Sequence, residues 1–208
     1  MASTVPVVFV LGCPGSGKTT LSALLTRDFP VKHISVGDLL RRIKNDTTHS
    51  QSGVIAPMLN RQELIDGNLL IPIIRSELEK IETLEPERRA VLVDGFPRNL
   101  AQLRIFEAEF EKPMVVLLFN CRAEIAKERY LTRNLEGRQT DDATMFEKRH
   151  GEFLRENEAI VHEYRERKLL IELDTSSKTD ESYARLCNRL GGDIRWAKVH
   201  RQPSHAFR

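Results

Sequence analysis

Cysteine is scarce in this chain of 208 residues, and the three that occur, Cys13, Cys121 and Cys187, are far apart. No two of them have the short spacing of a zinc site, and an odd, scattered set does not form a disulfide framework. Such cysteine usage is typical of proteins in a reducing compartment. The sequence therefore predicts free thiols, no zinc and a cytoplasmic location.

Long hydrophobic runs are also missing. No apolar stretch approaches the roughly 20 residues that a membrane-spanning helix needs. The first expected strand begins close to the start of the sequence, which leaves no room for a signal or transit peptide. We expect no membrane contact and a single domain over residues 1–208, because this length suits one hydrophobic core.

Charge of one sign is not in excess. Lys and Arg number 32, Asp and Glu number 30, and the net charge is +2. Proteins that bind nucleic acid usually have a strong positive excess, so this balance argues against a nucleic-acid partner. We expect small-molecule ligands and a monomer.

Glycine is concentrated at residues 12–20, which read Gly-Cys-Pro-Gly-Ser-Gly-Lys-Thr-Thr. An apolar run at residues 7–11 precedes this stretch and leucines at helical spacing follow it, so the order is strand, tight loop, helix. Glycines let backbone N–H groups surround a polyphosphate, Lys18 then reaches its outer phosphates, and Thr19 offers a hydroxyl to magnesium. A simple turn does not account for Lys and Thr at these offsets, so we interpret the stretch as a phosphate-binding loop, or P-loop.

Further apolar runs at residues 31–34, 90–93, 114–119 and 169–173 are expected to be strands. Helices are expected from residues 18, 39 and 72 onward, and at 59–65, 100–110, 124–134, 144–167 and 181–190. Alternation of strands and helices predicts an α/β fold with a central five-stranded parallel sheet and helices on both faces. Ligands bind beyond the carboxyl ends of such strands, where Gly12, Gly37, Asp94, Asn120 and Thr175 are expected.

Local signals predict where the helices of residues 36–72 begin and end. Asp38 is expected to cap the helix from residue 39, and residues 45–52 read as an exposed polar loop. Asp66 and Gly67 are expected to end the helix at 59–65, and Pro72 to stand at the first position of the next one.

Two residues after the third strand have candidate roles. Asp94 ends an apolar strand, where a carboxylate beside a P-loop is placed to hold magnesium or its water shell. The alternative for Asp94 is a turn cap. Arg98 follows Pro97 and suits bidentate capture of a phosphate, with a surface salt bridge as its alternative.

Arginines are frequent in the second half of the chain. Arg129 and Arg133 share one helical face, where like charges repel by about 0.2 to 0.5 kcal/mol unless acidic neighbours neutralise them. Arg149 lies at helical spacing between Phe146 and Phe153, and a cation on an apolar face is costly unless an anion meets it.

Arg138 stands in a polar loop at residues 134–142, which is expected to open and close. Arginines that converge on a triphosphate stabilise a transferring phosphoryl group, and one Arg can supply about 10³ to 10⁵ in rate. No His or Cys is placed to act as a covalent nucleophile, and this chemistry needs none.

Taken together, the motifs resemble the nucleoside monophosphate kinase family, which includes adenylate kinases and UMP/CMP kinases. The resemblance runs from about residue 7 to 190. It rests on the P-loop, residues 34–41, residues 94–98 with Gln102, Glu128-Arg129 with Arg133, Gly137-Arg138 and Lys148-Arg149. It implies a three-layer P-loop NTPase fold with a monophosphate-binding flap at about 37–71 and a short lid at about 134–142. Residues 191–208 form a basic tail outside the match.

The resemblance also implies transfer of the γ-phosphoryl group of Mg-ATP to a nucleoside monophosphate. The implied ATP-binding residues are Gly15, Ser16, Gly17, Lys18, Thr19, Thr20, Arg129, Arg133 and Ser177. The implied acceptor-binding residues are Val36, Arg41, Asn68, Leu69, Leu70, Gly95, Arg98, Gln102, Arg138 and Arg149. Lys18, Arg98, Arg129, Arg138 and Arg149 are the implied catalytic residues, and Thr19 and Asp94 would hold Mg²⁺, partly through water.

Different residues of the sequence indicate different bases for the acceptor nucleotide. Gln102 matches the residue that reads adenine in the family, Asn99 is similar to the pyrimidine branch, and Val36 matches neither. The expected acceptor is AMP, giving two ADP, with UMP or CMP as the alternative. The non-enzyme alternative is a pseudokinase or sensor that binds nucleotide without transferring phosphate.

Overall fold

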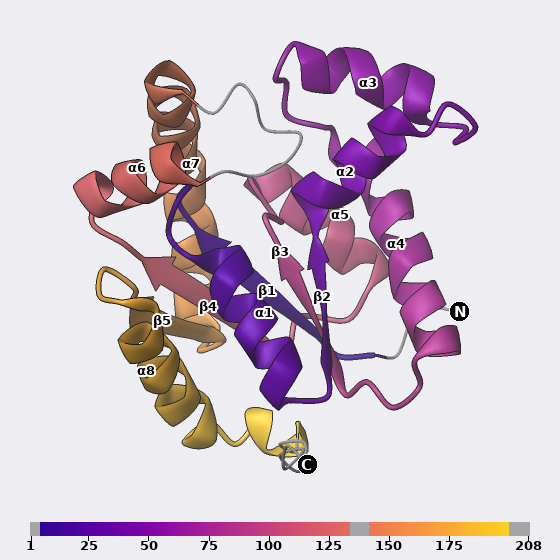
Figure 1. Ribbon diagram of the computed structural model, residues 1–208. Helices are drawn as coiled ribbons and strands as arrows, with labels where there is room; N and C mark the ends of the chain where they lie inside the picture. The colour runs from indigo at the N-terminus through magenta and orange to yellow at the C-terminus, as the bar shows by residue number, and fades with distance from the viewer. Residues whose placement is uncertain (1–4, 134–141, 200–208) are drawn as a thin grey trace, which may run out of the picture.

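The computed structural model describes residues 5–133 and 142–199. Its strands form one parallel sheet in the order β2-β3-β1-β4-β5 (Figure 1). The strands are β1 (Val7–Gly12), β2 (Val31–Ser35), β3 (Ala90–Asp94), β4 (Val115–Asn120) and β5 (Leu170–Asp174). The expected α/β fold with a five-stranded parallel sheet is confirmed, and all its strands lie within about one residue of the expected positions.

Helices connect the strands and cover both faces of the sheet (Figure 1). They are α1 (Lys18–Asp28), α2 (Val36–Asn45), α3 (Ser52–Asn60), α4 (Gly67–Leu84), α5 (Leu100–Glu109), α6 (Ala123–Thr132), α7 (Ala143–Glu166) and α8 (Thr179–Gly191), followed by the 3₁₀ turn η1 (Trp196–Lys198). None of the helices in the described part of the chain is long and apolar enough to cross a membrane.

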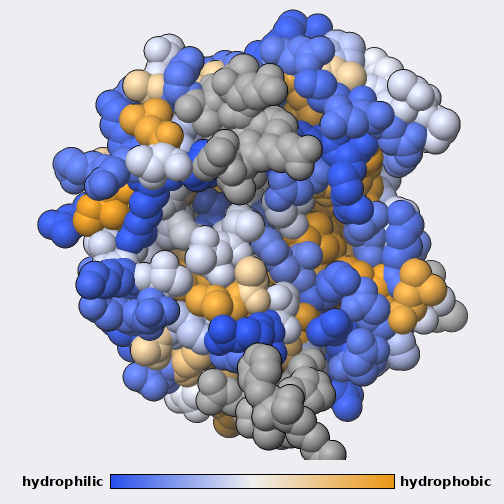
Figure 2. Space-filling model, viewed as in Figure 1, coloured by the Kyte–Doolittle hydropathy of each residue, from blue (hydrophilic) through white to orange (hydrophobic). Residues whose placement is uncertain are grey.

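Alternate side chains of each central strand enter different hydrophobic layers, as the two-residue period of a strand requires. In β1, Phe9 packs with α4, α5 and α7, and its ring lies 5.1 Å from that of Phe106. Val8 and Val10 point to the other face, where they pack with residues of α1 and α8. Burial of both faces produces three layers, and the surface in Figure 2 is mostly hydrophilic with smaller separate apolar areas.

A third, smaller cluster lies beside the P-loop. It consists of Cys13, Ala126, Tyr130, Met145 and Phe146. Because these residues come from the P-loop, α6 and α7, the cluster joins the phosphate-binding segment to the two helices that carry Arg129 and Arg149.

The carboxyl ends of the strands meet at one edge of the sheet. Ser35 of β2 lies beside Asp94 of β3, and Gly12 of β1 lies beside Phe119 of β4. In Figure 1, α2 and α3 lie beyond this edge on the β2 side, and α6 lies on the β4 side. The sheet therefore brings the P-loop and Asp94 to one edge, as expected.

Four local predictions between residues 36 and 72 are wrong. The helix expected at 59–65 lies earlier in the chain, as α3 from Ser52 to Asn60. Ile55 of this helix is fully buried against the core. Gln62 has a φ of 58°, a left-handed backbone conformation that interrupts a helix, and residues 61–66 are not helical. Packing of an apolar helix face therefore determines where this helix lies.

The other three errors concern the starts of α2 and α4. Asp66 begins α4 rather than ending a helix, since its carboxylate accepts from the Asn68 backbone N–H at 2.8 Å. Pro72 accordingly stands inside α4 and not at its first position. In α2 the cap is Ser35, whose hydroxyl accepts from the Asp38 N–H at 3.3 Å, so Asp38 lies in the first turn.

The described part of the tail packs on the body. Trp196 and Val199 are buried with the α1 and α8 layer, and the Trp196 ring meets Phe29 edge to face at 5.5 Å. Residues 200–208 and most of the expected lid, including Arg138, lie outside the described residues.

Candidate active site

The P-loop approaches α6 so closely that only glycine fits at one position. Gly15 has a φ of 80°, and a Cβ added there would lie 2.0 Å from the Ala126 carbonyl oxygen. Gly17, with a φ of 90°, immediately precedes α1, so the positive end of that helix faces the loop. The loop therefore has the backbone form that the glycine spacing predicts.

Lys18 lies across the P-loop. Its Nζ donates to the carbonyl oxygens of Gly12 at 2.8 Å and Cys13 at 2.9 Å. Burial lowers the pKa of its ammonium, Asp94 acts in the opposite direction, and the charges of Arg98 and Arg133 lower it further. A polyphosphate would supply the negative charge that this environment favours.

Ser16 also indicates an anion at this place. Its hydroxyl is completely buried and has no hydrogen-bond partner within the described structure. Because buried polar atoms are normally paired, an unpaired hydroxyl inside a P-loop is suited to a phosphate oxygen. Thr20, another expected ATP-binding residue, is exposed at the start of α1.

Thr19 and Asp94 lie together, as expected. The Thr19 hydroxyl donates to Asp94 Oδ2 at 3.2 Å, and His33 Nε2 lies 3.5 Å from the same oxygen. Burial would raise the pKa of Asp94, but His33, Lys18 and Thr19 outweigh it and hold this pKa below its ordinary value. An ionised carboxylate beside a hydroxyl fits Mg²⁺, which prefers oxygen ligands.

His33 is a site residue that the sequence reading missed. It stands in β2 one position from Lys32, and a polar pair within a short strand was its one local signal. Among the described residues, no group of three or more His, Cys, Asp or Glu side chains is arranged to hold a metal.

Arg41 and Arg149 both act electrostatically on Arg98. Although part of the Arg98 side chain is exposed, surrounding protein removes water from its guanidinium and lowers its pKa. The charges of Arg149 and Arg41 lower it further, against the effect of Asp94 and Glu152. A phosphate placed among these guanidinium groups would relieve their mutual repulsion.

The loop after β3 is held in place around Arg98. Arg98 Nε donates to the Gly95 carbonyl at 3.1 Å, and the Arg98 backbone N–H donates to Gln102 Oε1 at 2.8 Å. Gln102 Nε2 donates to the Ile65 carbonyl at 2.8 Å. Gln102 is thus buried and joins the Arg98 loop to the segment before α4.

The remaining acceptor-side residues lie at the starts of α2 and α4. Val36 and Leu70 are buried, Leu69 is half-buried, and Asn68 is exposed. The Asn68 side-chain amide donates to Asp66 Oδ1 at 2.8 Å. The structure therefore places Asn68 at the surface, Leu69 partly buried against the core, and Val36 and Leu70 in the core.

Arg129 is fixed to the loop after β5. Its guanidinium donates to the Thr175 carbonyl at 2.8 Å and the Ser177 carbonyl at 2.6 Å, and it contacts Cys121 Sγ at 3.7 Å. In this conformation Arg129 shapes the segment that contains Ser177. Its role as a phosphate ligand stays a prediction.

Tyr130 is a second residue that the sequence reading did not single out. The Arg133 guanidinium lies over its ring, 4.0 Å from the centroid, and Arg149 donates to its hydroxyl at 3.1 Å. The two arginines thus meet at one buried side chain of α6.

Comparisons with known proteins agree with this geometry. A family model described as adenylate kinase matches residues 10–169. A UMP-CMP kinase of Danio rerio is 30% identical over 191 residues, which cover 90% of this chain and 97% of that protein. A UMP-CMP kinase of Lentinula edodes is 31% identical over 189 residues, covering 86% of this chain and 82% of that one.

A further relative is named an adenylate kinase. Adenylate kinase isoenzyme 5 of Homo sapiens is 30% identical over 179 residues, which cover 85% of this chain and 31% of that longer protein. The fold, the P-loop and these matches over most of the sequence agree, so this chain belongs to the adenylate kinase family of nucleoside monophosphate kinases.

Proposed function

We propose that this chain transfers the γ-phosphoryl group of Mg-ATP to AMP, giving two ADP. The observation that carries the proposal is the electrostatic connection between the P-loop and the arginines beside it. In addition to burial, the charges of Arg98 and Arg133 lower the pKa of Lys18, and the charges of Arg149 and Arg41 lower the pKa of Arg98. The charge of Asp94 acts to raise both pKa values. Donor and acceptor phosphates bound to these groups would lie next to each other.

Roles follow from the positions of the groups. The P-loop N–H groups and Lys18 would bind the ATP phosphates, and Thr19 with Asp94 would hold Mg²⁺, partly through water. When bound, Mg²⁺ neutralises charge on the phosphates. Arg41 and Arg98 would hold the acceptor phosphate, and Arg149 would stabilise charge on the group in transfer. Arg138 would act from the lid.

The Gln102 carboxamide favours an acceptor base that has an amino group beside a ring nitrogen. Its bonds with Arg98 and Ile65 leave one N–H and one oxygen lone pair of the carboxamide, which suit N1 and the 6-amino group of adenine, respectively. Cytosine presents the same donor and acceptor pattern, whereas uracil presents the reverse. The carboxamide therefore favours AMP or CMP over UMP, and the size of the base pocket decides between those two.

UMP or CMP is the second candidate acceptor. Two observations favour it: the relatives named UMP-CMP kinase match most of this chain, and Val36 provides no hydroxyl at the start of α2. A panel of AMP, dAMP, CMP, UMP and GMP at saturating Mg-ATP separates the candidates. We expect the highest kcat/KM with AMP, whereas negligible AMP turnover beside good UMP or CMP turnover would overturn this choice. A protein that binds ATP and forms no ADP with any acceptor would be the non-enzyme alternative.

A further inference from the structure

Tyr130 connects the two sides of the proposed site. Arg133 lies over its ring at 4.0 Å from the centroid, a cation–π geometry, while Arg149 donates to the hydroxyl at 3.1 Å. The two arginines belong to different elements, since Arg133 caps the end of α6 and Arg149 lies in α7. One side chain therefore contacts both guanidinium groups.

The ring is itself held rigidly. Tyr130 has no exposed surface, and it packs with Cys13 of the P-loop and with Phe146 of α7. The Phe146 ring lies 5.5 Å away at an angle of 60°. Because the ring cannot move without disturbing this cluster, Arg133 and Arg149 contact a side chain whose own position is fixed.

The two arginines act electrostatically on different residues of the proposed site. The charge of Arg133 acts on Lys18 in the P-loop, and the charge of Arg149 acts on Arg98 in the loop after β3. Lys18 belongs to the proposed ATP side and Arg98 to the proposed acceptor side. Tyr130 thus lies between a donor-side and an acceptor-side arginine.

We infer that Tyr130 is a positioning residue, which holds Arg133 and Arg149 at the separation needed by a phosphoryl group in transfer. The inference rests on the proposed function. Tyr130 takes no part in bond making; it acts through the two guanidinium groups. Its loss should therefore slow the chemical step more than it weakens nucleotide binding.

Two substitutions separate the hydroxyl from the ring. Tyr130→Phe keeps the ring under Arg133 and removes the hydroxyl to which Arg149 donates, so we expect kcat to fall about 10-fold. Tyr130→Leu removes both contacts, and we expect kcat to fall about 100-fold. The KM values for ATP and acceptor should stay within about 2-fold in the Phe variant.

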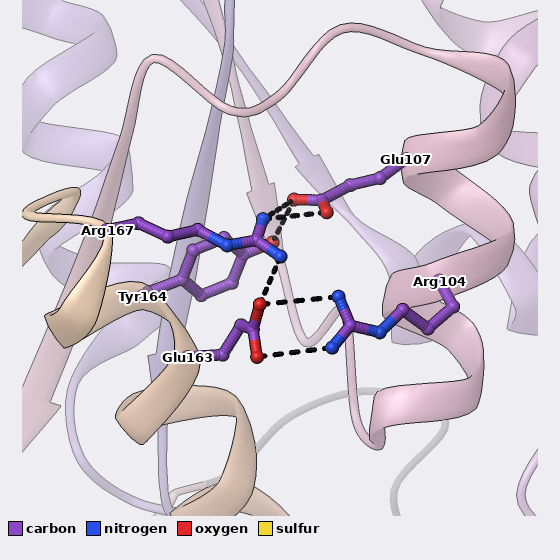
Figure 3. Close-up of polar contacts among 5 residues, drawn as sticks. All are labelled: Arg104, Glu107, Glu163, Tyr164 and Arg167. Atoms are coloured by element: carbon purple, nitrogen blue, oxygen red, sulfur yellow. Dashed lines mark hydrogen bonds and ion pairs between the residues drawn. The ribbon is translucent and has the colours of Figure 1, made fainter.

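Tyr164 provides a matched control. It is also fully buried, its hydroxyl lies 3.4 Å from Glu107 Oε1, and Arg167 lies over its ring at 5.7 Å (Figure 3). Tyr164→Phe removes the same hydroxyl from the contact between α5 and α7. We expect it to lower the melting temperature as Tyr130→Phe does, with kcat unchanged.

A double-mutant cycle shows whether Tyr130 acts through Arg149. Initial rates with radiolabelled ATP are compared for the wild type, Tyr130→Phe, Arg149→Ala and the double variant. We expect Tyr130→Phe to have no further effect once Arg149 is removed, because the group it positions is gone. Fully additive losses, an unchanged kcat in Tyr130→Phe, or an equal kcat loss in Tyr164→Phe would each overturn the inference. A wild type that phosphorylates no mononucleotide would overturn the proposed function itself, which distinguishes the two failures.

Discussion

The Thr19 hydroxyl donates to Asp94 Oδ2 across 3.2 Å, which joins the first turn of α1 to the end of β3. This contact places a hydroxyl and a carboxylate side by side at the carboxyl edge of the sheet. It also forms part of the environment that keeps the buried Asp94 ionised, together with Lys18 and His33.

Asp94 should therefore make stability depend on pH in a defined direction. The pKa of Asp94 is lower in the folded chain than its ordinary value of about 3.9. Its contribution to the free energy of unfolding is therefore fully present above that ordinary value and is lost as pH falls through the lower pKa of the folded chain. We expect the difference in unfolding free energy between the wild type and Asp94→Asn to shrink from pH 6 to pH 3. Urea unfolding at several pH values measures it, and a difference that grows as pH falls would contradict the assignment.

Neighbouring arginines of α2 should differ in function. Arg41 contacts Asp38 and acts electrostatically on Arg98, whereas Arg42 is exposed and pairs with Glu77 at 3.5 Å. We expect Arg41→Ala to raise the acceptor KM about 10- to 100-fold, because charge-assisted bonds to a phosphate are strong. The control Arg42→Ala should change it less than about 2-fold. Equal effects of the two substitutions in steady-state kinetics would refute this placement of the acceptor phosphate.

Gly15 should not tolerate a side chain. Gly15→Ala combines a left-handed backbone with a Cβ at 2.0 Å from the Ala126 carbonyl oxygen. We therefore expect the free energy of unfolding to fall by at least about 2 kcal/mol and the melting temperature by about 4 to 8 °C. Gly53→Ala is the control, since a Cβ there meets nothing within 4 Å. Differential scanning calorimetry compares the two variants. Similar melting temperatures would show that the close approach of the P-loop to α6 is not rigid.

The ion pairs between α5 and α7 should contribute to stability without affecting catalysis. Arg167 donates to both Glu107 oxygens at 2.7 Å and also pairs with Glu163, which binds Arg104 (Figure 3). We expect Glu107→Ala to lower the melting temperature by about 2 to 4 °C with kcat unchanged. Glu147→Ala, which breaks the more exposed pair with Lys127, should lower it by less than about 1 °C.

The sequence predicts those parts of the site that depend on local patterns. The P-loop follows from glycine spacing between a strand and a helix, and Asp94 from a polar residue at the end of an apolar run. Both patterns involve residues close together in the chain, and the parallel sheet then brings strand ends to one edge. This is why Lys18, Thr19 and Asp94 meet as expected.

Tertiary packing determines what the sequence did not show. The extent of α3 depends on Ile55 reaching the core, and no local signal in residues 45–60 reveals that contact. Tyr130 reads as an ordinary buried position of a helix, and its role becomes visible only when α7 brings Arg149 to its hydroxyl. Gln102 is bonded to Ile65, which lies 37 positions earlier in the chain.

Direct transfer between two nucleotides is the central claim, and the fate of a labelled γ-phosphoryl group tests it most directly. The purified chain is incubated with Mg²⁺, γ-labelled ATP and AMP, and the products are separated, with Lys18→Ala as the inactive control. The proposed site predicts that the label passes to the β position of ADP formed from AMP, with little inorganic phosphate. Label that appears only as inorganic phosphate, or that stays in ATP with every mononucleotide tried, would contradict it.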